Sequence, residues 1–143
     1  MVRVFNGEIF LDHRGEIKSI NNFNLEEIKR IYFITHPDVS TIRGWHGHKL
    51  ERKWFYCIKG SFVLGLVIPD NWDDPSPNLP SEIYKLHDSE SKVICVPCGY
   101  ANCLKAIKKN SIMLVMSDKT LSEAEQDSWR YNSDLWVDWK VYS

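Results

Sequence analysis

The 143-residue sequence has no long apolar run and no excess of charge of one sign. Its longest apolar stretch, residues 62–68, is far shorter than the roughly 20 residues of a membrane-spanning helix. The first ten residues lack the apolar core of a secretory signal peptide, so we expect a cytoplasmic protein without a membrane partner. The formal net charge of −1 argues against nucleic acid as the main partner, because neutralising phosphates needs a basic face.

Cysteine is also scarce, with four residues that give no convincing metal pattern: Cys57, Cys95, Cys98 and Cys103. Cys95 and Cys98 form a CxxC, which in other proteins binds zinc or performs redox chemistry. The alternating residues 92–97 predict a strand, in which the two thiols would point in different directions. We therefore expect reduced, mostly buried thiols, with zinc binding or redox chemistry as the less favoured alternative.

Internal repeats, low-complexity segments and domain boundaries are absent, so we expect residues 1–143 to form a single domain. Short segments rich in Val, Ile, Phe, Tyr and Trp predict strands. The predicted strands are 8–11, 16–20, 28–36, 41–48, 53–58, 61–68, 81–86, 92–97, 103–107, 111–117 and 136–142. Their spacing favours an all-β antiparallel sandwich or barrel. Residues 69–80 predict an exposed loop. Residues 122–129 predict a short helix with a capping box from Ser122 to Glu125.

Polar side chains gather on the predicted strand faces. Residues two apart in a strand share a face, so His46 and His48 should point together. Lys53 lies on the next predicted strand, and Arg30 and Tyr32 share a face on an earlier one. If these faces line one barrel, its mouth holds two imidazoles, an ammonium, a guanidinium and a phenol. Burying such groups indicates a ligand or a catalytic task.

Two segments resemble the motifs of the cupin family. Residues 46–60 resemble the first motif, HxH-x(3,4)-E-x(6)-G, and residues 97–102 are similar to the second, PxG-x-x-H. Lys53 replaces the glutamate of the first motif, and Asn102 replaces the histidine of the second. An ammonium repels a divalent metal and a carboxamide is a weak ligand, so we expect no metal and no organic cofactor. The resemblance implies a double-stranded β-helix, or jelly-roll barrel.

The resemblance is narrower than the cupins as a whole. The chain resembles the sugar-nucleotide cupins, which are dTDP-4-keto-rhamnose 3,5-epimerases and dTDP-4-keto-6-deoxyglucose 3,4-ketoisomerases. Residues 12–15 form the DxRG of these enzymes, and 27–32 with 43–49 are similar to the ketoisomerase signature. Lys53 and residues 132–139 are closer to the epimerases. The resemblance implies a nucleotide-sugar substrate, a homodimer and a place in cell-surface polysaccharide synthesis.

The family reaction moves protons on carbons next to a C4 ketone, which implies roles for four residues. His46 would be the base, because imidazole titrates near neutral pH. Lys53 would stabilise the enolate oxygen as a preorganised charge. His48 or Tyr32 would return the proton. The outcome would be 3,4-keto migration or epimerisation at C3, or at C3 and C5.

The substrate-binding residues implied by the resemblance are Arg30, Arg43 and Asn102, with the two guanidiniums gripping the diphosphate. The sequence departs from the epimerases at two points. Residues 117–121 contain no tyrosine acid, and the late aspartate that supports the catalytic histidine has no counterpart before Ser143. These departures keep open a non-catalytic cupin that binds a sugar nucleotide as a sensor or as a partner of a transferase. A metal-dependent oxygenase is a third hypothesis, and it needs bound iron.

The remaining histidines and the late tryptophans carry no site in this interpretation. His13, His36 and His87 belong to no constellation of reactive residues, so we expect them to be structural. Trp129, Trp136 and Trp139 are expected to pack a core or an oligomer interface rather than to bind a sugar.

Overall fold

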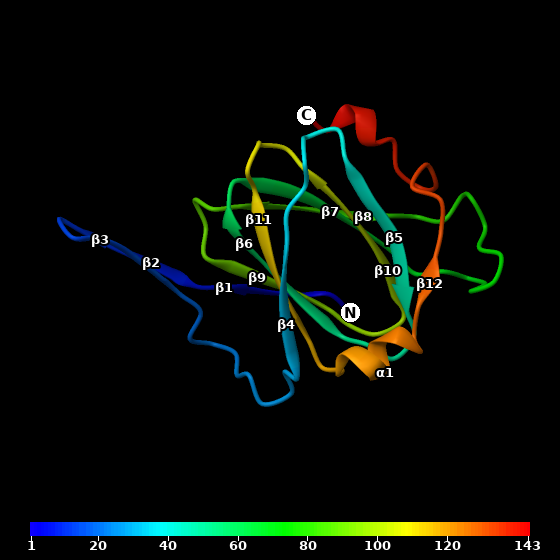
Figure 1. The fold of residues 1–143 in the computed structure, drawn as a ribbon, viewed down its shortest axis with the longest axis horizontal. Helices are drawn as coiled ribbons and strands as arrows, with labels where there is room; N and C mark the ends of the chain where they lie inside the picture. Colours follow the sequence, from blue (N-terminus) through cyan, green and yellow to red (C-terminus); the bar gives the residue numbers. More distant parts are fainter.

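The computed structural model describes all 143 residues and is built almost entirely from antiparallel strands (Figure 1). The strands are β1 (Arg3–Asn6), β2 (Glu8–Asp12), β3 (Gly15–Ser19), β4 (Arg30–Ile34), β5 (Ile42–His48), β6 (Lys53–Lys59), β7 (Ser61–Val67), β8 (Glu82–His87), β9 (Lys92–Val96), β10 (Tyr100–Ala106), β11 (Ile112–Ser117) and β12 (Trp129–Arg130). The helices are α1 (Leu121–Glu125) and the 3-10 turn η1 (Trp139–Val141). Neither helix is long and apolar enough to cross a membrane.

Ten strands form two facing sheets of five. One sheet has the order β1-β9-β6-β11-β4 and the other β12-β5-β10-β7-β8. Strands that follow one another in sequence often cross to the opposite sheet, as β4 to β5 and β5 to β6 do. This two-sheet antiparallel arrangement is the jelly-roll barrel of the cupins, which confirms the predicted fold class. The remaining strands, β2 and β3, form a hairpin that projects from the barrel (Figure 1).

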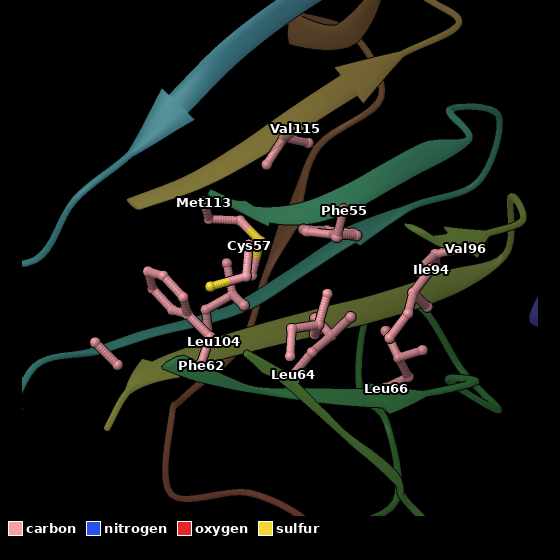
Figure 2. Close-up of a cluster of buried hydrophobic side chains, with 12 residues drawn as sticks. Phe55, Cys57, Phe62, Leu64, Leu66, Ile94, Val96, Leu104, Met113 and Val115 are labelled. Atoms are coloured by element: carbon pink, nitrogen blue, oxygen red, sulfur yellow. The ribbon is translucent and has the colours of Figure 1, made fainter. Parts of the chain in front are cut away.

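The main core fills the space between the two sheets (Figure 2). Inward-facing residues alternate along each strand, so Phe55, Leu64, Ile94, Leu104 and Val115 reach it from five different strands. All five are buried. Full burial of such a side chain contributes about 1.5–3 kcal/mol. This apolar layer is the rigid base on which the polar residues at the mouth of the barrel are positioned.

The C-terminal segment covers the outer face of the second sheet, and its predicted strand at 136–142 is wrong. Trp45 on β5 packs edge-on against Trp136 at 5.0 Å and lies 6.1 Å from Trp139. In a strand, residues three positions apart point to opposite faces, whereas Trp136 and Trp139 both reach Trp45. The backbone turns instead, with Trp136 in the left-handed region at φ 66° and η1 starting three residues later.

The predicted helix is also displaced. Thr120, not Ser122, is the N-cap, and its hydroxyl accepts from the Glu123 N–H while the Glu123 carboxylate accepts from the Thr120 N–H. This capping box starts the helix two residues earlier than predicted and ends it at Glu125. The sequence prediction also missed β1 and β12 and began β10 three residues late. Most other strand ends differ by one or two residues.

Candidate active site at the mouth of the barrel

A cavity of about 600 Å³ opens between the two sheets, and all the predicted site residues line it. These residues are Arg30, Tyr32, Arg43, His46, His48, Lys53 and Asn102. They come from β4, β5, β6 and β10, and residues of α1 and β12 complete the wall. The strand periodicity therefore brings together side chains that are up to 72 positions apart in the sequence.

Strand register explains this convergence. In the first sheet, Ser117 on β11 lies opposite Arg30 on one side and Lys53 on the other. In the second sheet, His46 on β5 lies opposite Arg130 and Asn102. Each sheet thus carries one row of polar side chains, and the two rows face the same cavity.

The two histidines form a close pair of neutral rings. Their centroids are 4.2 Å apart. His48 Nδ1 donates to the Asp127 carbonyl oxygen at 2.7 Å, and because a carbonyl only accepts, this bond places the proton on Nδ1. His46 Nε2 lies 2.7 Å from the Ser128 hydroxyl. Burial, together with the neighbouring His48 and Lys53, lowers the pKa of His46 to about 3. Burial and Lys53 also lower the pKa of His48.

Lys53 brings a buried ammonium to this pair. Its closest carboxylate oxygen is Glu51 Oε1, at 4.0 Å, which is beyond hydrogen-bond distance. Burial lowers the pKa of Lys53 to about 8, although Glu51 raises it. The side chain is therefore still largely charged at neutral pH, and its donors are available to a ligand oxygen in the cavity.

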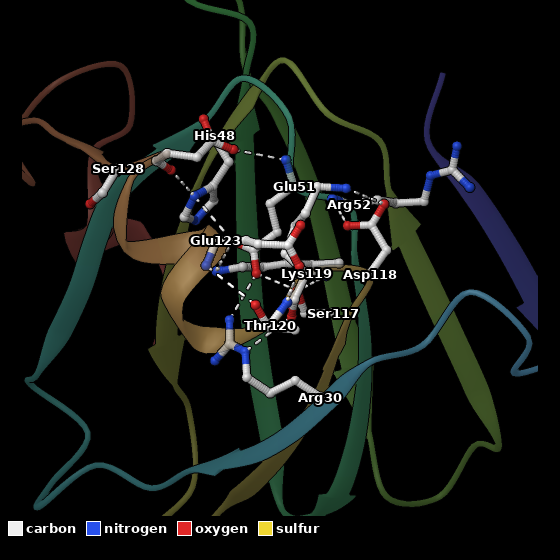
Figure 3. A network of polar contacts seen from close by, with 12 residues as sticks. Arg30, His48, Glu51, Arg52, Ser117, Asp118, Lys119, Thr120, Glu123 and Ser128 are labelled. Atoms are coloured by element: carbon white, nitrogen blue, oxygen red, sulfur yellow. Dashed lines mark hydrogen bonds and ion pairs between the residues drawn. The ribbon is translucent and has the colours of Figure 1, made fainter.

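Glu51 is the main site residue that the sequence prediction missed (Figure 3). Its side chain is fully buried in the turn between β5 and β6. It accepts from Arg30 Nη2 at 2.9 Å and from the Ser117 hydroxyl, and it lies 3.2 Å from His48 Nδ1. The spacing HxH-x-x-E was the sequence signal that could have indicated it. A carboxylate is thus present near the cupin motif, but it contacts cations and a hydroxyl.

The arginines of the cavity differ in whether they already form a salt bridge with a carboxylate. Arg30 is paired with Glu51, so it is less available to a ligand than predicted. Arg43 and Arg130 line the cavity and form no salt bridge with a carboxylate. Arg130, which the sequence prediction did not select, is close enough to lower the pKa values of His46 and Lys53. These two free guanidiniums give the cavity its capacity for an anionic group.

Tyr32 and Asn102 make contacts within the protein that the sequence prediction did not include. Burial, together with Glu51, raises the pKa of Tyr32 to about 12, so its phenol stays protonated. The Arg30 guanidinium lies 4.8 Å above its ring. The Asn102 amide donates to the His46 carbonyl at 3.3 Å and so helps to join β10 to β5.

The side chains do not form a metal-binding group. No three His, Cys, Asp or Glu residues are arranged to hold a metal ion. In the CxxC, Cys95 is buried beside Trp54 on the outer face of the first sheet, whereas Cys98 is exposed. All four cysteines are free thiols.

Comparisons with known proteins place the chain in a family. The model of the family "FdtA: WxcM-like, C-terminal" matches residues 2–134, so the chain belongs to this family. The chain is 29% identical over 102 residues to the TDP-4-oxo-6-deoxy-α-D-glucose-3,4-oxoisomerase of Aneurinibacillus thermoaerophilus. That match covers 64% of this chain and 73% of the relative.

Solved structures of a sugar-nucleotide ketoisomerase and a sugar-nucleotide epimerase are similar to this chain. A double mutant of the QdtA 3,4-ketoisomerase from Thermoanaerobacterium thermosaccharolyticum, in complex with TDP, is 25% identical with a TM-score of 0.71. The match covers 99% of this chain and 96% of that one. The dTDP-4-dehydrorhamnose 3,5-epimerase of Bacillus anthracis is 18% identical and shares the fold, with a TM-score of 0.78 over 99% of this chain and 86% of that one. The predicted resemblance to sugar-nucleotide cupins is confirmed.

Proposed function

We propose that the protein is a 3,4-ketoisomerase of a dTDP-linked 4-keto-6-deoxyhexose. The observation that carries the proposal is the pair of neutral imidazoles beside the Lys53 ammonium, in a cavity that also holds free guanidiniums. A neutral imidazole accepts a proton, and a desolvated ammonium stabilises the oxygen that gains charge. The named activity of the relatives supports the same reaction.

The proposed reaction moves one proton between neighbouring carbons. His46 takes the proton from C3, the C3–C4 double bond forms, and the C4 carbonyl oxygen becomes an enolate oxygen held by Lys53. A proton passes from the C3 hydroxyl to the C4 oxygen, and the C3 oxygen becomes the new carbonyl. Protonated His46 then returns its proton to C4 on the same face. Atoms and charge balance without a cofactor, and one base suffices.

Two features favour ketoisomerisation over epimerisation. The imidazoles come from adjacent positions of one strand face, which suits proton transfer on one face of the sugar. Epimerisation at C3 needs a second group to deliver a proton to the opposite face, and residues 117–121 contain no tyrosine to do so. In the proposed complex, Arg43 and Arg130 bind the diphosphate, whose oxygens suit forked guanidiniums.

The test is proton NMR of dTDP-4-keto-6-deoxyglucose incubated with the protein in heavy water. We expect the ketone to move to C3, with deuterium at C4 wherever protonated His46 exchanges with the solvent before it returns its proton, and His46→Ala to abolish the change while dTDP binding persists. His13→Ala, on the exposed turn of the β2–β3 hairpin, is the matched control and should keep full activity. Deuterium at C3 or C5 with the ketone still at C4 would instead identify an epimerase. Binding of dTDP with neither ketone migration nor exchange would support the non-catalytic sugar-nucleotide binder.

We also propose that the protein is cytoplasmic and homodimeric. Free cysteines are the state expected in a reducing compartment, which supports the first point. The second rests on the β2–β3 hairpin, where Phe10 and Ile17 lie directly opposite each other and are 58% and 63% exposed. An isolated two-stranded hairpin is only marginally stable in water. Strand β4 is at the edge of its sheet and exposes Ile31 and Phe33, so it offers a place where a second copy's hairpin would be covered.

A further inference from the structure

Glu51 has an unusual position for a charged residue. Its side chain has no exposed surface, yet one of its oxygens, Oε1, makes no hydrogen bond. The other oxygen is satisfied by Arg30 and Ser117. Leaving a buried acceptor unsatisfied costs about 1–3 kcal/mol, and more for a charged group. Such an atom in a native interior needs an explanation.

The free oxygen lies near Lys53, which the proposed reaction uses, and near His48, which packs against the proposed base His46. Oε1 is 3.2 Å from His48 Nδ1 and 4.0 Å from Lys53 Nζ. His48 Nδ1 already donates to the Asp127 carbonyl, so the Oε1 charge acts on His48 and Lys53 mainly through space. His48 Nε2 is likewise buried without a partner. The interior of the site therefore contains two unsatisfied acceptors beside an ammonium with free donors.

We propose that Glu51 is a positioning residue that keeps Lys53 charged. The alternative is a purely structural ion pair with Arg30. That alternative accounts for Oε2, which Arg30 contacts, but it leaves the position of Oε1 unexplained. This inference rests on the proposed function, because Lys53 matters to catalysis only if an enolate forms beside it.

The charges around Lys53 show why a carboxylate is needed. The groups closest to Lys53 are His46 and His48 from β5, Arg30 and Tyr32 from β4, Arg130 from β12, Asp127 from the segment before β12, and Glu51. Arg43 from β5 and Glu125 from α1 also line the cavity. The carboxylate of Asp127 is occupied by three backbone N–H groups of the β5–β6 turn. Both carboxylates raise the pKa of Lys53, and Glu51, which has the larger effect and lies 4.0 Å from Nζ, is the one with a free oxygen to offset the repulsion from the two guanidiniums.

The test compares Glu51→Gln with the wild type and with Glu27→Gln, which removes an exposed carboxylate paired with Arg52. For this titration the protein is produced with ¹³C-labelled lysine. The Lys53 signal in the NMR spectrum is assigned as the one missing from the variant Lys53→Met. An opposite charge within about 4–6 Å typically shifts a titration midpoint by about 1–3 pH units. We expect the Lys53 midpoint to fall by about one pH unit or more in Glu51→Gln and to stay unchanged in Glu27→Gln. An unchanged midpoint in folded Glu51→Gln would overturn the proposal.

A second variant and an activity profile complete the test. If Glu51→Gln does not fold, Glu51→Asp withdraws the charge from Lys53 and should give a smaller fall in the same direction. In both variants the alkaline limb of the kcat/KM profile should move to lower pH together with the Lys53 midpoint, whereas a structural ion pair would lower activity equally at every pH. The NMR titration needs no substrate. A wild type without isomerase activity would therefore sink the proposed function alone, and an immobile Lys53 midpoint would sink the role of Glu51 alone.

Discussion

At the level of single residues, the proposed reaction depends on neutral histidines beside a charged lysine. Burial works against every charge in the cavity, but it affects the groups differently. It drives His46 and His48 far toward the neutral form, whereas Lys53 starts from a high enough pKa to remain charged near neutrality. A base and a cation thus coexist 7 positions apart in the sequence without neutralising each other.

The buried histidines make the stability of the protein sensitive to acid. The pKa of His46 is about 3 when folded and 6.5 in the unfolded chain, so between these values the unfolded state binds more protons. The free energy of unfolding should therefore be highest above about pH 6.5, as far as His46 determines it, and should fall as the pH drops toward 3. Urea denaturation at pH 7.5, 5.5 and 4.5 measures this. His46→Asn should flatten the dependence and His13→Asn should not; equal slopes in all three proteins would contradict it.

Strand periodicity predicted most of this site because it places residues on faces without knowledge of the fold. It selected His46, His48 and Lys53 together, and the structure brings all three to one cavity. The same reasoning could not select Glu51, which lies in a turn where alternation does not apply. Its inward direction is set by Asp127, 76 positions later, whose carboxylate accepts its backbone N–H.

At the scale of elements, the segment between α1 and β12 fixes the β5–β6 turn. The Asp127 carboxylate accepts the N–H groups of Lys49, Leu50 and Glu51, each at 2.8 Å. Its carbonyl accepts from His48. One buried residue therefore satisfies the turn that carries Glu51 and also sets the tautomer of a site histidine.

Replacing this carboxylate tests its importance. Asp127→Asn keeps one acceptor oxygen, without its charge, for the N–H groups of Leu50 and Glu51, but its NH₂ group then faces the N–H of Lys49, so one of the three bonds is lost and the other two are weakened. We expect a loss of about 1–3 kcal/mol in the free energy of unfolding, measured by urea denaturation. Glu26→Gln, an exposed change in the β3–β4 connection, should lie within about 0.5 kcal/mol of the wild type. A wild-type stability for Asp127→Asn would show that the turn does not need the carboxylate.

The elements themselves were predictable where their own residues alternate, and not where distant partners decide. Strands β5, β6 and β7 lie within one residue of the predicted ends because apolar side chains recur along them. Strand β12 has two residues, too few to show a period, and exists because β5 pairs with it. The segment 136–142 has the composition of a strand, but its aromatic side chains pack in one cluster with Trp45 instead.

At the scale of the whole molecule, the barrel buries its own core and leaves one element uncovered. The β2–β3 hairpin pairs only with itself and extends beyond the two sheets (Figure 1). Apolar side chains point from both of its faces, since Ile9 and Leu11 are exposed as well as Phe10 and Ile17. Exposed apolar surface of this kind marks an interaction site more often than a free surface.

If the hairpin is the dimer contact, charges placed on it should separate the subunits. In the double variant F10D/I17D, two carboxylates replace apolar side chains that lie directly opposite each other. They would have to be desolvated beside one another in an interface, so association should be lost while the barrel, which does not use these residues, stays folded. Light scattering after gel filtration should give the mass of two 16.8 kDa chains for the wild type and of one for the variant. The control E16Q changes an exposed charge on the same hairpin and should remain dimeric. A monomeric wild type, or a variant that is still dimeric, would remove the hairpin from the interface and leave its apolar surface to a different partner.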